Sequence, residues 1–341
     1  MIMNNNSNNK NIVIWLNISI FFLVIMVMIG GITRLTDSGL SMVDWKPITG
    51  ILPPLNDTQW ADSFNEYKKF PEYKQKNIDM SLSEYKYIYF WEYLHRMMGR
   101  FFGLLFLIPF SFFLMLGFLN KKITKHLLLI FVLGGFQGFI GWYMVKSGLV
   151  NNPDVSHYRL SLHLFIAFVI LAYTYKIKLS LVFYNIKKIN NYIFYNKLSQ
   201  LIIFLLFVQV IFGAFNAGLK TVNIISTFPF YNGMVFPVSK MSINPFWLNF
   251  FENNYGVQFV HRYLAFIIVF IISYFTYKIN LKSSRIKLES QYVLSLILYQ
   301  CIFGVLTLIS NATIVFALIH QLLAVLTILV MIKINHKMKY I

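Results

Sequence analysis

The residues from Ile12 to Gly31 read IVIWLNISIFFLVIMVMIGG, an apolar run of about 20 residues without a charged side chain. An α-helix of this length crosses the hydrocarbon core of a membrane. The run is too long for the apolar part of a signal peptide, and no A-x-A cleavage site follows it. We therefore expect a retained first transmembrane helix.

Seven further apolar stretches have the length of a membrane span. They lie at 93–119, 126–146, 159–183, 199–219, 257–281, 291–310 and 312–334. The 341 residues are 57% hydrophobic and only 12% charged, against roughly 25% charged residues in a soluble protein. These values exclude a soluble protein and predict an all-α integral membrane protein with eight transmembrane helices. The last two spans form a tight hairpin around Asn311, and the longest connections are 32–92 and 220–256.

Positive charge is divided unevenly between the two sides of the predicted membrane. One side holds the N-terminus, 120–125, 176–197, 278–287 and the tail after 332, with sixteen Lys and Arg; one acid, Glu289, lies just beyond 278–287 on the same side. The other side holds the remaining fourteen basic and eleven acidic residues. Because Lys and Arg collect in cytoplasmic loops, we expect both termini in the cytoplasm and both long connections outside. The net charge of +18 is then mainly a topology signal.

The second half of the chain repeats the order of the first. In each half a long outer connection is followed by a His-Arg pair near the start of a span, at His95-Arg96 and at His261-Arg262. The pattern Gln-x-x-x-Gly occurs three times, at 137–141, 209–213 and 300–304. Its small residues allow helices to approach closely. We expect two similar four-helix bundles, residues 1–198 and 199–341, related by an axis along the membrane normal.

Four histidines occupy equivalent places in the even-numbered spans. They are His95, His163, His261 and His320. Each lies within about three turns of the outer end of its span, so that all four share one depth. Four residues later, on the same helical face, each is followed by a small residue: Gly99, Ala167, Ala265 and Ala324. Two histidines on facing helices suit axial ligation of one haem iron, and the small residues leave clearance for a flat macrocycle.

The alternative is that these histidines are isolated polar residues that hold helices together. Their agreement in depth, repeat position and following residue favours haem. Zinc would need further cysteine or carboxylate ligands. The single cysteine, Cys301, lies in an apolar run and excludes a disulfide framework, a CxxC site and a thiolate-ligated haem.

An acidic residue distinguishes the first half from the second. Glu92 lies three residues before His95, whereas Gln258, which cannot ionise, lies three residues before His261. A glutamate facing an apolar haem pocket would be suited to proton transfer. The alternative is a glutamate at an interfacial helix start, where the helix dipole favours negative charge.

Two arginines directly follow their histidines, Arg96 after His95 and Arg262 after His261. Near the outer surface their guanidinium groups are candidates for pairing with haem propionates. Contact with lipid headgroups is the alternative, and it applies equally to Arg100.

The connection after the first span begins with a run rich in Gly and Pro, GGITRLTDSGLSMVDWKPITGILPP from Gly30 to Pro54. This run, His163 and His320, and the motifs Glu92-x-x-His95-Arg96 and Gln258-x-x-His261-Arg262 closely resemble haem A synthases. The similarity is to the mitochondrial and alpha-proteobacterial branch of that family. It extends over nearly the whole chain, from about residue 25 to residue 335.

The resemblance implies an oxidoreductase that converts the C8 methyl group of haem O to a formyl group, giving haem A for cytochrome c oxidase. It implies that His95 and His163 bracket the substrate haem, with Glu92 beside it as the catalytic residue. It further implies that His261 and His320 are the axial ligands of a permanent cofactor, haem b. Expected partners are haem O and the lipid bilayer, with haem O synthase and oxidase assembly factors as candidates. Self-association stays open, and no nucleic acid is expected.

The chain departs from the family pattern in two places. Another branch of the family carries a cysteine pair in an outer loop, which is missing here, so that a thiol–disulfide step is unavailable. The segment 217–229 follows the family pattern only loosely, which leaves open how it covers the haem b site.

Two other functions compete with the synthase. A di-haem b electron carrier, such as a quinol-linked cytochrome b, usually places its haems near both membrane faces, which the shared depth of the histidines opposes. A transporter would show broken spans and acids near the midplane, which the sequence lacks. The first ten residues contain no arginine and do not resemble a mitochondrial transit peptide. Together with a richness in Asn, Lys and Ile, this favours a bacterial inner membrane over the mitochondrial inner membrane.

Overall fold

The computed structural model describes residues 5–43, 50–148, 154–183, 186, 192–282 and 285–340. Regular structure within these residues is helical, and the only strand-like pairing among them is a bridge between Tyr231 and Met234. Eight helices are long and apolar enough to cross a membrane, as predicted. They are α1 (Asn5–Leu35), α4 (Leu82–Met115), α5 (Lys121–Gly148), α6 (His157–Val182), α7 (Ile193–Gly218), α9 (Asn254–Lys282), α10 (Lys287–Ile309) and α11 (Ile314–Lys337).

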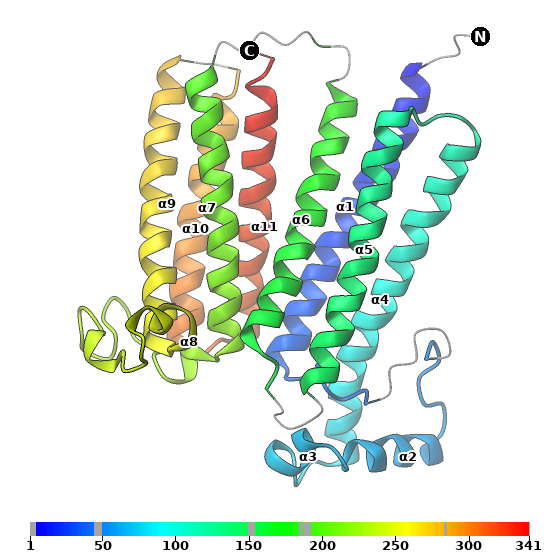
Figure 1. Ribbon diagram of the computed structural model, residues 1–341, viewed down its shortest axis with the longest axis vertical. Coiled ribbons are helices and arrows are strands. Elements are labelled where there is room, and N and C mark those ends of the chain that lie inside the picture. Colours follow the sequence, from blue (N-terminus) through cyan, green and yellow to red (C-terminus); the bar gives the residue numbers. More distant parts are fainter. Residues whose placement is uncertain are drawn as a thin grey trace.

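Short helices occupy the two long connections. The first connection contains α2 (Asp57–Tyr67) and α3 (Pro71–Lys76); the second contains η1 (Thr221–Asn223), η2 (Val238–Lys240), η3 (Phe246–Leu248) and α8 (Asn249–Glu252). Figure 1 shows α2, α3 and α8 at one end of the helices and both chain termini at the other. Both long connections therefore lie on the side opposite the termini, as the charge distribution predicted.

The spanning helices pack in two groups of four (Figure 1). In the first group α1 packs on α4 and α5 on α6; in the second α7 packs on α9 and α10 on α11. The groups meet where α6 contacts α7 and α11, and where α1 contacts α11. This order is consistent with an internal repeat. The division into functional domains after residue 198 stays a prediction. Helix α7 begins at Ile193, so that this boundary falls inside α7.

Helix α4 begins well before the residue that the hydropathy pattern predicted. Ser81 and Glu84 form a capping box that starts α4 at Leu82 rather than at residue 93. A capping box satisfies free backbone N–H groups and stabilises a helix start outside the apolar run. The added turns bury Tyr85 and Tyr89 against α2. His157, expected in a connection, is the first residue of α6.

The apolar side chains divide between a helix-packing core and an outer surface. The core includes Leu16, Ile202 and Phe275, which are fully buried between the spanning helices. By contrast, Phe270 in α9 is 74% exposed and Ile108 in α4 is 62% exposed. A soluble protein rarely exposes so many large apolar side chains, but a bilayer solvates them without cost.

Candidate functional site

Each of the four predicted histidines lies against a glycine of the preceding spanning helix. A Cβ atom added to the glycine would lie 2.9–3.3 Å from the Cε1 atom of the histidine, closer than ordinary van der Waals contact. The pairs are Gly30 with His95, Gly141 with His163, Gly213 with His261, and Gly304 with His320. We call these four glycines the histidine seats. Only glycine allows a helix backbone to come this close to an imidazole ring.

The glutamines four residues before three of these seats hold the histidine turns in place. The side chains of Gln137 and Gln209 donate hydrogen bonds of 3.0 Å to the backbone carbonyls of His163 and His261. The backbone carbonyl of Gln300 accepts a 2.8 Å bond from Nδ1 of His320. That bond leaves Nε2 of His320 as the nitrogen able to bind a metal. The Gln-x-x-x-Gly pattern signalled close helix packing, but the contact of its glycines with the histidines was missed.

The histidines associate in two pairs, one in each helix group. His95 on α4 and His163 on α6 are within electrostatic range of each other, and so are His261 on α9 and His320 on α11. The four histidines lie in the halves of their helices nearer α2, α3 and α8 (Figure 1). His163, His261 and His320 are about two turns from the helix start, whereas His95 is nearly four turns in, because α4 begins early.

The histidine pairs fit an iron porphyrin. Nδ1 of His95, His163 and His261 is buried without a hydrogen-bond partner among the described residues. These Nδ1 atoms lie on the side of each ring that faces the seat glycine, which leaves Nε2 as the nitrogen able to bind a metal; Nε2 of His261 lies 3.4 Å from the side-chain nitrogen of Gln209. No group of three or more His, Cys, Asp or Glu with the geometry of a metal site occurs in the described part of the chain. A porphyrin occupies four positions of its iron and leaves two for the protein, which is the number each pair provides.

Glu92 is buried beneath the first connection. Its side chain is 3% exposed, and its Oε2 accepts hydrogen bonds from Ser41 Oγ at 2.6 Å and from the Met42 N–H at 2.8 Å. Its Oε1 pairs with Arg96 at 2.5 Å, and Arg96 also donates to the Met42 carbonyl. Because α4 begins at Leu82, the alternative of a glutamate at a helix start is wrong. Glu92 and Arg96 instead hold residues 41 and 42 on α4.

The second half contains the same arrangement without the carboxylate. Gln258 is 4% exposed, accepts a bond from Arg262 at 2.5 Å and donates to the Ile225 carbonyl at 3.2 Å. Arg262 also donates to the Thr227 carbonyl at 2.7 Å and lies over the ring of Tyr231, 4.3 Å from its centroid. Both arginines thus bind loop carbonyls. Their predicted contact with haem propionates stays a prediction.

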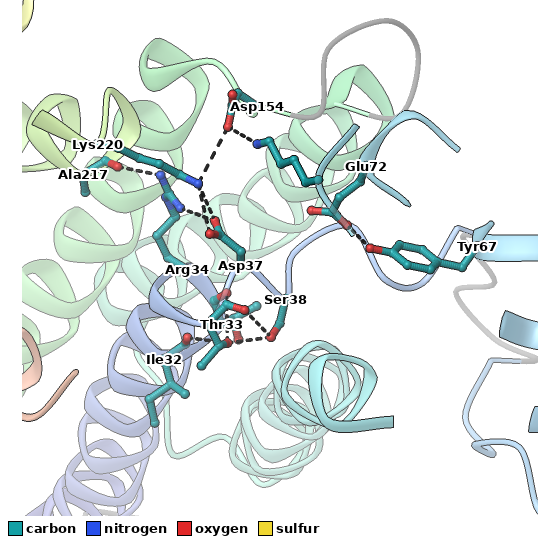
Figure 2. Close-up of polar contacts among 12 residues, drawn as sticks. Ile32, Thr33, Arg34, Asp37, Ser38, Tyr67, Glu72, Asp154, Ala217 and Lys220 are labelled. Atoms are coloured by element: carbon teal, nitrogen blue, oxygen red, sulfur yellow. Dashed lines mark hydrogen bonds and ion pairs between the residues drawn. The ribbon is translucent and has the colours of Figure 1, made fainter. Parts of the chain in front are cut away.

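A network of charged residues crosses the face where the two groups meet (Figure 2). Its ion pairs are Arg34–Asp37 at 2.9 Å, Lys220–Asp37 at 3.0 Å, Lys220–Asp154 at 3.9 Å and Lys76–Asp154 at 2.5 Å. Arg34 also donates to the carbonyl of Ala217 at the end of α7, over 2.6 Å. Asp37 and Asp154 are more than half exposed, so that each pair contributes little alone. The network links α3, the end of α1 and the start of η1.

A buried acid that the sequence did not single out lies beside this network. Glu72 on α3 is 4% exposed and accepts a 3.0 Å bond from the hydroxyl of Tyr67, which itself accepts one from Asn77 (Figure 2). Burial raises the pKa of the Glu72 carboxyl to about 7, although the bond from Tyr67 opposes the shift. The charges of Glu92 and Asp37 raise this pKa further, and Lys76 lowers it. We call helices α2 and α3 the cap. Only the folded form of this cap creates the environment of Glu72.

Residues 44–49 of the Gly30–Pro54 run, including Asp44, Trp45 and Pro47, lie outside the described residues. Cys301 is a free, half-buried thiol in α10, directly after Gln300, whose backbone carbonyl accepts the bond from His320.

Fold and site together define a multi-pass helical membrane protein with one pair of seated histidines in each half. The chain belongs to the cytochrome oxidase assembly protein family, whose model matches residues 13–332. A haem A synthase of Flavobacterium johnsoniae is 42% identical over 323 residues, covering 93% of this chain and 94% of the relative. A haem A synthase of Wolbachia from Brugia malayi is 41% identical over 324 residues, covering 92% of both chains. One from Neorickettsia sennetsu is 42% identical over 320 residues, covering 91% of this chain and 94% of the relative.

Proposed function

We propose that this protein is a haem A synthase, an oxidoreductase that converts the C8 methyl group of haem O to a formyl group. The observation that carries the proposal is the asymmetry between two otherwise matching histidine pairs. Both pairs are seated on glycines, but a buried acid accompanies only the first. A haem that reacts requires a nearby acid, whereas a haem that is retained unchanged does not. The nearly full-length similarity to haem A synthases supports the same conclusion.

In this proposal His95 and His163 hold the substrate haem O, and His261 and His320 hold haem b. The iron porphyrin, when bound, supplies the redox chemistry. The chain positions the imidazoles, because the histidine seats and the glutamine hydrogen bonds fix the rings and their backbone. Rigid support of this kind sets the geometry of a reacting group.

Glu92 is the residue we assign to proton transfer at the substrate methyl group. Its Oε1 pairs with Arg96 and its Oε2 accepts bonds from residues 41 and 42, which fixes the position of the carboxyl group that would exchange the proton. Residues 41 and 42 also cover this acid, since Ser41 is fully buried. Gln258 at the matching position accepts no proton, which suits a haem that is retained unchanged.

The shared position of the histidines supports the synthase over the electron carrier. All four lie toward the end of the helices that carries α2, α3 and α8, opposite the termini (Figure 1). A carrier that moves electrons across a membrane needs haems near both faces. We further propose a bacterial inner membrane location with both termini in the cytoplasm, supported by the Lys and Arg distribution. Haem O synthase and oxidase assembly factors are the proposed partners.

The test is extraction of the haems from the purified protein. Haem B together with haem O, or with the alcohol or aldehyde derived from it, supports the synthase. Two equivalents of haem B alone support the di-haem carrier. A His261→Ala variant should lose haem B and keep the capacity to bind haem O at the first pair. Full retention of haem B in that variant would refute the assignment of the second pair.

A further inference from the structure

The side chain of Gln321 leaves its own helix group and contacts the other. Gln321 directly follows His320 on α11, and its Nε2 donates a 2.8 Å hydrogen bond to the carbonyl of Val27 on α1. Its Oε1 lies so close to Gly31 that a Cβ atom at that glycine would overlap it. A half-buried amide that is both hydrogen-bonded and packed against a backbone holds the two helices at one separation.

The turn of α1 that Gln321 contacts is the turn that supports His95. Gly30, the seat of His95, lies between Val27 and Gly31, and its Cβ position is 3.2 Å from His95 Cε1. Any movement of this turn relative to α4 changes the space available to the His95 ring. The packing of α1 against α11 therefore bears directly on the first histidine pair.

The first seat differs from those in α5 and α7 in how it is held. In α5 and α7 the side-chain amide of a glutamine four residues before the seat donates to the histidine backbone, whereas in α10 the backbone carbonyl of Gln300 accepts the bond from His320. The corresponding residue in α1 is Met26, which has no amide. Gln321 provides an amide contact to the same turn from outside the group.

We propose that Gln321 is a positioning residue for His95, which makes the first histidine pair dependent on the helix that carries His320. The inference rests on the proposed function only because its test measures the bound haems. Glutamine suits this role because its N–H₂ group donates to a helical carbonyl that still has a free lone pair. A glutamate would place a carboxylate against that carbonyl, and a leucine would fill the space without the bond.

The test compares the purified, haem-loaded protein with a Gln321→Leu variant. The readouts are the electron paramagnetic resonance signals and midpoint potentials of the ferric haems, which report the orientation of the axial imidazoles. We expect the first-site signal and potential to shift while the second-site haem content and signal stay unchanged. An unchanged first site would overturn the inference, and so would an equal shift at both sites, because that would indicate general destabilisation.

A matched control and a second variant make the test specific. Gln209→Leu removes the bond to the His261 carbonyl and should shift the second-site signal alone. Gly31→Ala should shift the first site, because the new methyl group displaces Gln321, and Gln321→Ala added to it should leave the signal shifted, because the bond to Val27 is then absent. If Gln321→Leu does not fold, Gly31→Ala decides, since an unshifted first site in that variant overturns the inference. Absence of haem from the unaltered protein would refute the proposed function, whereas bound haems with unshifted signals would refute only the role of Gln321.

Discussion

The imidazole of His320 lies against Gly304 of the preceding helix, with a Cβ position on the glycine 2.9 Å from Cε1 of the ring. The same contact recurs in all four histidine-bearing helices, at equivalent positions. A glycine at each seat therefore serves the histidine and not merely the packing of two helices. This relationship gives the most direct test of the site.

Gly304→Ala should weaken haem binding at the second pair. The added methyl group forces the His320 ring to move, and overpacking of this kind costs about 1–3 kcal/mol. The affinity for haem should fall by roughly tenfold or more, measured as haem B content after purification. Gly138→Ala is the matched control, because no atom of the described residues lies within 4 Å of its Cβ position. A full haem complement in Gly304→Ala would show that the seat has no role in ligation.

Glu92→Gln should abolish conversion of haem O while preserving its binding. The amide is close in size to the carboxylate and still accepts the bond from Ser41, but it neither ionises nor pairs with Arg96 as a charge. Loss of a general base lowers the rate by roughly 10²–10⁴-fold, measured as the ratio of haem A to haem O in membranes. Gln258→Glu is the counterpart in the second half and should leave this ratio intact. Normal haem A formation by Glu92→Gln would remove the catalytic assignment.

Arg96→Lys and Arg262→Lys should have different effects on activity. Each lysine keeps the charge but loses the several hydrogen bonds that a guanidinium makes to the loop carbonyls. Hydrogen exchange should rise in residues 41–43 for the first variant and in 225–231 for the second. Activity should fall mainly in Arg96→Lys, since only Arg96 pairs with an acid. Equal activity in both variants would contradict this difference.

The cap formed by α2 and α3 should become less stable as the pH rises toward 7. The pKa of Glu72 is raised by burial from 4.5 to about 7, so that the folded cap binds a proton which the opened cap releases between these values. The stability of the cap is then greatest below pH 4.5 and is lost as the pH rises through about 7. Limited proteolysis between residues 57 and 76 should accelerate by up to about tenfold per pH unit in this window. Glu72→Gln should show no such dependence, and an unaltered pH profile in that variant would assign the effect to another group.

The sequence alone predicted the membrane class, the eight spans and the four histidines. Long apolar runs are local signals, because a bilayer requires about 20 apolar residues wherever a helix crosses it. The uneven distribution of Lys and Arg between the two sides of the membrane is also read from short segments. The tight turn at Asn311 is also local: Asn311 and Ala312 adopt positive φ values of 53° and 60°. The start of α4 was placed too late, since hydropathy does not register a capping box in a polar segment.

Only the tertiary structure decided what surrounds the histidines. The bonds from Ser41 and Met42 to Glu92 join residues about fifty positions apart, and the bond from Gln321 to Val27 joins residues 294 positions apart. Such contacts depend on which helices are neighbours, on their rotation and on their separation, none of which hydropathy or spacing specifies. The sequence determined which side chains are present at one depth of the membrane. Packing decided which glycine each ring lies against, and which acid is buried beside the first pair.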